Sequence, residues 1–135
     1  MTTTTINTWL VIRLVVSQRV DEIVFSITFK NDADQPQQLM FSNLSRKAEL
    51  LGLRIKDANG KRIEPDRKFI GRPTSYTEPG RWLKPGQEWS YELIGKLTNG
   101  VLDFPSALYR LTPGQHYYAR FVYQHIPSNE VEYIV

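Results

Sequence analysis

Residues 108–124, LYRLTPGQHYYARFVYQ, constrain the fold of this chain more than any other stretch. After the turn Thr-Pro-Gly, the side chains alternate between two faces. One face carries Tyr117, Ala119, Phe121 and Tyr123. A two-residue period of this kind is typical of a β-strand that buries one face and exposes the other. We therefore predict a turn followed by a half-buried strand, with most of its aromatic rings pointing inward.

The turn that opens this strand occurs a second time in the chain. LKPGQEWSYEL at residues 83–93 and LTPGQHYYARF at residues 111–121 share the pattern Leu-x-Pro-Gly-Gln-x-aromatic, offset by 28 residues. Two copies with unrelated segments between them do not make a solenoid repeat. They predict one corner geometry that is used twice within a single domain.

The rest of the chain also alternates between short apolar stretches and polar turns. Asn-Gly and Pro-Gly pairs, which favour tight turns, separate several of these stretches. The predicted strands cover residues 9–17, 23–30, 38–42, 51–56, 61–63, 82–93, 117–124 and 131–135. We expect one helical turn at 45–50 and loops at 31–37, 64–80, 95–106 and 125–130.

Many short alternating strands favour an all-β fold, and 135 residues correspond to one domain. We predict a single antiparallel β-sandwich of seven to eight strands over residues 1–135, with 1–7 as a frayed lead-in. A jelly roll and a small barrel remain open as alternatives. The segment Leu111-x-Pro-x-x-x-Tyr117 resembles the tyrosine corner of immunoglobulin-like and fibronectin type III domains. This resemblance implies an immunoglobulin-like sandwich in which the Tyr117 hydroxyl bonds the backbone a few residues upstream.

The composition and the short motifs exclude several classes of chemistry. The chain has no cysteine, so disulfides, thiolate metal sites and cysteine catalysis are excluded. His116 and His125 are nine residues apart and lack the spacing of a zinc-binding helix. No P-loop, dinucleotide fingerprint or Gly-x-Ser-x-Gly is present. Asp32 and Asp34 suit a turn better than a calcium loop. We expect no enzymatic activity, no metal and no cofactor.

The first residues do not form a targeting segment. They lack a basic start, and Arg13 interrupts the apolar run that follows. We therefore expect no membrane partner, and a cytoplasmic protein if Met1 is the natural start.

The middle third of the chain is basic. Residues 46–84 hold eleven basic and five acidic side chains, a net charge of +6, with aromatic residues among them. Cations interleaved with stacking rings suit a groove for single-stranded nucleic acid or another polyanion. This alternative function would use Arg46, Lys47, Arg62, Arg67, Lys68 and Arg72.

The favoured hypothesis is protein binding through loops at the ends of the sandwich, because rigid β-sandwiches commonly lend such loops to recognition. The loops 31–37, 64–80 and 125–130 are the candidates. The predicted contact residues are Asp32, Asp34, Phe69, Tyr76, His125, Ile126 and Asn129. A further alternative is a structural module that assembles through residues 131–135 as an edge strand.

Four segments, taken in order, are similar to the intracellular proteinase inhibitor family of bacteria, the BsuPI-like domains. They are FSITFKNDADQPQQLMF, LRIKDANGKRI, WLKPGQEWSYEL and YRLTPGQHYYARFVY, and together they span roughly residues 25–123. This chain departs from that family in its long 64–80 segment and in its basic character. The resemblance implies a β-sandwich whose protein partner is a protease.

Overall fold

The computed structural model describes residues 9–39, 52–67, 81–105 and 107–135, and every structural statement below concerns these residues. They form strands, turns and loops, and all the strand pairs are antiparallel. The predicted all-β antiparallel fold is therefore confirmed. No helix in these ranges is long and apolar enough to cross a membrane.

The larger sheet has six strands in the order β1-β2-β7-β8-β9-β5. Its long members pair along nearly their whole length. The strands are β1 (Leu10–Gln18), β2 (Glu22–Asn31), β7 (Glu88–Thr98), β8 (Val101–Asp103), β9 (Ala107–Arg110) and β5 (Asp66–Arg67).

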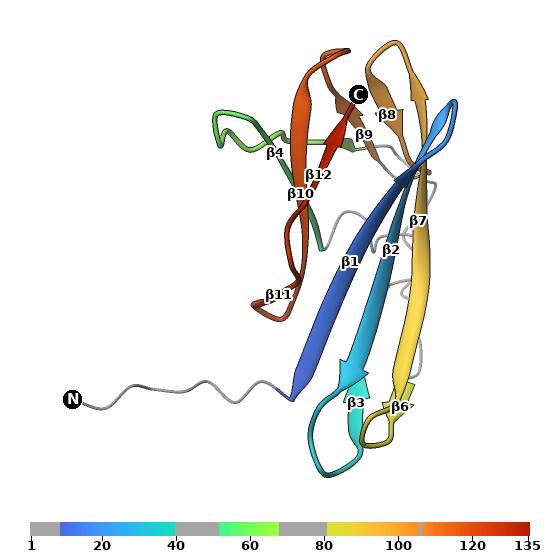
Figure 1. Ribbon diagram of the computed structural model, residues 1–135, viewed down its shortest axis with the longest axis vertical. Helices are drawn as coiled ribbons and strands as arrows, with labels where there is room; N and C mark the ends of the chain where they lie inside the picture. The colour runs from blue at the N-terminus through green and yellow to red at the C-terminus, as the bar shows by residue number, and fades with distance from the viewer. Residues whose placement is uncertain (1–8, 40–51, 68–80, 106) are drawn as a thin grey trace, which may run out of the picture.

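The smaller sheet is built on one strand, β10 (His116–Tyr123). One edge of β10 pairs with β4 (Leu53–Asp57), and its other edge pairs with β12 (Val131–Ile134) and β11 (Ile126–Pro127). A separate two-stranded ribbon joins β3 (Gln37–Leu39) to β6 (Arg81–Leu83). Figure 1 shows the smaller sheet beside the larger one, with the β3–β6 ribbon at the lower end.

The core lies between the two sheets. Four alternate side chains of β2, the strand predicted at 23–30, are fully buried: Ile23, Phe25, Ile27 and Phe29. The ring of Phe29 meets Phe121 of the smaller sheet edge to face, with the ring centroids 5.8 Å apart. Phe25 meets Tyr133 in the same way at 5.5 Å. Aromatic rings therefore bind the two sheets together through apolar burial and edge-to-face contacts.

The turn predicted from the repeated Leu-x-Pro-Gly-Gln motif is present in both copies of the motif. The backbone N–H of Thr112 donates a hydrogen bond of 2.7 Å to the hydroxyl of Tyr117, which is the bond of a tyrosine corner. Gly86 and Gly114 hold φ values of 78° and 82°, in the left-handed region that glycine accepts without strain. In each copy the Gln that follows the glycine donates its backbone N–H three residues back along the chain. The two turns thus share one geometry.

A side-chain amide closes the seam between the sheets. The Asn129 side chain accepts a hydrogen bond from the backbone N–H of Leu14 at 2.8 Å and donates one to the carbonyl of Leu14 at 2.9 Å. Farther along the same edge of β1, the Gln18 amide donates to the carbonyl of Ile134. The outer edges of β1 and β12 are therefore bridged by side chains.

Several predicted segments are corrected by the structure. Residues 66–67 of the predicted 64–80 loop form β5, residues 126–127 of the predicted 125–130 loop form β11, and β9 lies where no strand was predicted. The loop expected at 95–106 is largely strand, because β7 runs on to Thr98 and a tight Asn99-Gly100 turn leads into β8. Lys96, Leu97 and Thr98 alternate between polar and apolar as a strand does, but Gly95, a residue common in loops, favoured the loop interpretation. The expected strand at 61–63 is a single bridge between Lys56 and Arg62.

The remaining differences concern numbers and topology. The described ranges contain twelve strand segments, more than the seven to eight strands expected, and several of the twelve have only two or three residues. The immunoglobulin-like strand order stays a prediction. The helical turn expected at 45–50 lies outside the described residues, as does the frayed lead-in at 1–7.

Candidate functional site

The loop at 31–37 is braced from within by one buried amide. Asn31 is completely buried, and its Nδ2 donates to the carbonyls of Gln35 and Leu83, both at 2.9 Å. Its Oδ1 accepts the backbone N–H of Ala33 at 2.9 Å. The side chain uses both donors and one acceptor on backbone groups, so it fixes the loop and ties it to the start of the next turn.

The backbone of Asn31 adds a second connection to that turn. Its N–H donates to the carbonyl of Gln87 at 3.1 Å, and its carbonyl accepts the N–H of Gly86 at 2.8 Å. Asp32 and Asp34 are exposed on the outside of the braced loop. The fold therefore presents two carboxylates on a loop whose backbone is held in place.

An exposed tryptophan lies next to this loop. Trp82 of β6 is 63 % exposed, while its neighbour Leu83 is buried. Gln38 stands directly opposite Trp82 on β3, which follows the loop in the chain. The residue before Trp82 is Arg81, and its guanidinium lies 4.6 Å from the centre of the Trp89 ring. The ribbon thus holds one large apolar ring toward solvent at the sandwich end.

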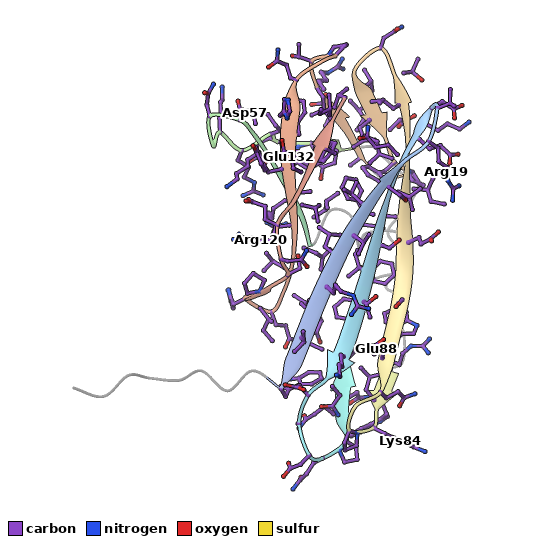
Figure 2. The ribbon with its side chains drawn as sticks, in the orientation of Figure 1. Arg19, Asp57, Lys84, Glu88, Arg120 and Glu132 are labelled. Carbon is purple, nitrogen blue, oxygen red and sulfur yellow. The ribbon has the colours of Figure 1, made fainter. Side chains whose placement is uncertain are left out.

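Figure 1 places the β3–β6 ribbon and the turn that leads into β3 together at the lower end of the larger sheet. Lys84 and Glu88, labelled at the same end in Figure 2, bracket the turn between β6 and β7. We call the exposed residues of this end the ribbon-end surface. They include Asp32, Asp34, Trp82 and Lys84.

The 125–130 segment is more firmly built into the fold than the sequence suggested. Gln124 and His125 have φ values of 45° and 66°, and they form the two-residue turn between β10 and β11. His125 is exposed, but Ile126 is half-buried and packs against the core. Ile126, one of the predicted contact residues, thus also packs against the core.

The end of that segment is tied down by polar side chains. The buried Ser128 hydroxyl accepts the backbone N–H of Phe121 at 2.8 Å and donates to the carbonyl of Asn129 at 2.8 Å. The Asn129 amide is used on Leu14, as described above. Of the predicted contact residues in this segment, His125 alone has an exposed side chain that no described contact engages.

The other predicted contact and patch residues are dispersed. Phe69 and Tyr76 lie outside the described residues, as do Arg46, Lys47, Lys68 and Arg72. Arg62 is exposed, and its guanidinium lies 3.2 Å from the carboxylate of Glu64. Arg67 belongs to β5 and pairs with Ala107 across the sheet. Of the six predicted patch residues, Arg62 and Arg67 are thus the two that lie within the described ranges.

Titratable groups do not gather into a catalytic arrangement in the described ranges. His116 Nδ1 lies 2.6 Å from Glu132 Oε1, and both side chains are half exposed. The same ranges contain no group of three or more His, Asp or Glu side chains that could hold a metal ion. Burial raises the pKa of Tyr133, which lies in the core away from solvent.

The sequence did not single out Trp82 as an exposed ring or Asn31 as a brace. For Trp82 a pattern was available, because the repeated corner aligns Leu83 with the inward Leu111 and so turns residue 82 outward. For Asn31 none was available, since Leu83 lies 52 residues away and no local pattern couples them.

Two comparisons with known proteins bear on identity. No protein-family model matches this chain, and no curated protein matches it in sequence. The likeness to bacterial proteinase inhibitors therefore stays a prediction that rests on the motifs quoted above.

Proposed function

We propose that this chain is a non-enzymatic protein-binding module that recognises its partner through the ribbon-end surface. The observation that carries the proposal is the 63 % exposed ring of Trp82 on a ribbon beside a braced loop. Tryptophan is enriched among the residues that dominate binding energy at protein interfaces. A scaffold that holds such a ring in solvent supports a recognition role.

The bracing by Asn31 supports the same proposal. A loop that is already ordered loses little conformational freedom when a partner binds, so more of the contact energy appears as affinity. The carboxylates of Asp32 and Asp34 are exposed on the braced loop at the same end of the molecule, and they would favour a partner that presents basic residues beside its apolar pocket. A protease is the partner class that the motif resemblance favours.

Affinity capture with matched variants tests the proposal. The purified chain is used as bait in extracts of its source cells, beside Trp82→Ala and the pair Asp32→Asn/Asp34→Asn. We expect loss of a central tryptophan to weaken binding by about 30-fold or more. The bound protein should therefore disappear with Trp82→Ala, whereas with the Asp pair it should bind more weakly and with less dependence on salt.

Val20→Ala is the control, because Val20 is fully exposed in the turn between β1 and β2. Arg19 of the same turn is labelled at the opposite end of the molecule in Figure 2. The proposed surface would be contradicted if Val20→Ala and Trp82→Ala lost the partner equally. It would also be contradicted if both variants still captured the partner. Inhibition of a protease by the wild type, but not by Trp82→Ala, would assign the partner class.

A further inference from the structure

Two arginines stand directly opposite each other on the outer face of the smaller sheet. Arg54 of β4 is in register with Arg120 of β10. Their neighbours along the strands are buried, so both guanidinium groups belong to the face that points away from the core. Figure 2 shows Arg120 on this side of β10, away from the larger sheet. Like charges at directly opposite positions destabilise a sheet pair unless an anion compensates them.

The described acids of this face are already engaged with other cations. Glu130 Oε1 lies 2.9 Å from Lys56 Nζ, and Glu132 Oε1 lies 2.6 Å from His116 Nδ1. Among the described residues, Arg54 donates to the carbonyl of its neighbour Leu53, at 3.3 Å, and Arg120 has no hydrogen bond or ion pair. Within this part of the chain, the two guanidinium groups are thus left without a carboxylate.

An aromatic ring and further cations adjoin the arginine pair. Tyr118 lies two residues before Arg120 on the same face, and it is half-buried with Lys56 Nζ 6.0 Å from its ring centre. The backbone of Lys56 forms an isolated antiparallel β-bridge with that of Arg62, in the segment after β4. The cations therefore follow a path from Arg120 on β10, through Arg54 and Lys56 on β4, to Arg62. The ring of Tyr118 lies beside this path.

We propose that this face binds single-stranded nucleic acid, with a backbone phosphate held between Arg54 and Arg120. Arginine suits this role because its planar guanidinium makes paired hydrogen bonds to phosphate oxygens. A base adjoining that phosphate stacks on Tyr118, and the next phosphates pass Lys56 and Arg62, where they compete with the carboxylates of Glu130 and Glu64. A line of cations with a ring fits a strand of nucleic acid better than a single small anion. This site is separate from the ribbon-end surface and does not depend on it.

Fluorescence anisotropy with a labelled single-stranded oligonucleotide of mixed sequence tests the site across a series of salt concentrations. The double variant Arg54→Gln/Arg120→Gln should bind at least about 10-fold more weakly at low salt. Each phosphate contact to a single strand adds about 0.7 to the slope of log affinity against log salt, so loss of the one phosphate held by this pair should lower the slope by about 0.7. Tyr118→Leu should weaken binding about 5-fold or more through lost stacking.

Arg13→Gln/Lys96→Gln removes the same charge from exposed positions of the larger sheet and serves as the control. Circular dichroism verifies that each variant is folded. Equal weakening of oligonucleotide binding by the two double variants would show that net charge alone determines binding, and it would contradict the proposed site. So would unchanged binding by Tyr118→Leu, or binding of a phosphopeptide but not of the oligonucleotide. Failure here leaves capture through Trp82 unaffected, so the two proposals are tested independently.

Discussion

At the scale of single residues, two tyrosine hydroxyls in the same core have opposite roles. The Tyr117 hydroxyl accepts the backbone N–H of Thr112, whereas the Tyr133 hydroxyl is buried without a hydrogen-bond partner in the described ranges. An unsatisfied buried hydroxyl costs stability, and a satisfied one contributes about 1 kcal/mol. Tyr117→Phe should therefore lower the free energy of unfolding by about 1 kcal/mol. Tyr133→Phe should leave it unchanged or raise it.

The same residue predicts a pH dependence. Burial raises the pKa of Tyr133 above the ordinary value of a tyrosine, so the folded chain keeps this proton where the unfolded chain has lost it. Its contribution to stability is complete below about pH 10 and is lost at higher pH, by up to about 1.4 kcal/mol per pH unit. Denaturant unfolding of the wild type and Tyr133→Phe from pH 8 to pH 11 measures both effects. Parallel losses in the two proteins would contradict the assignment.

At the scale of elements, two glycines in turns separate backbone strain from steric conflict. Gly100 and Gly114 share a φ of 82°, but a Cβ on Gly100 would lie 2.3 Å from the carbonyl oxygen of Leu111, and one on Gly114 would meet no atom within 4 Å. Gly114→Ala should cost about 1–2 kcal/mol from the φ strain alone. Gly100→Ala should cost clearly more. Thermal unfolding of the two variants decides this, and equal losses would show that the β7–β8 turn yields.

Local pattern is also what made the elements predictable. The alternation around Phe29 identified the buried face of β2, and the Leu-x-Pro-Gly-Gln motif identified both corners, because turn chemistry and strand period are encoded by neighbours in the chain. The partners of Asn129 and Asn31 were not predictable, since they lie 115 and 52 residues away. The partial burial of Ile126 was not predictable for the same reason, because it depends on the packed core and not on the polar neighbours of Ile126 in the chain.

At the scale of the whole molecule, one amide joins the two sheets at their seam. In Asn129→Asp, the Nδ2 donor is replaced by a carboxylate oxygen that faces the carbonyl of Leu14, so a hydrogen bond becomes a repulsion. We expect a loss of about 1–3 kcal/mol in the free energy of unfolding. Asn59→Asp is the control, because the side chain of Asn59 is exposed in the hairpin after β4. Equal stability of both variants would show that the seam does not depend on this amide.

The Asn129 amide also has a consequence for how molecules of this chain meet one another. Strand β1 borders the larger sheet and carries exposed Val11 and Val15, which makes it a template on which a foreign strand could add and begin a fibre. Strand addition requires a run of free backbone groups, and the amide occupies the N–H and carbonyl at the middle of that run. The side chain that closes the seam thereby also interrupts the run of backbone groups on which a foreign strand would pair.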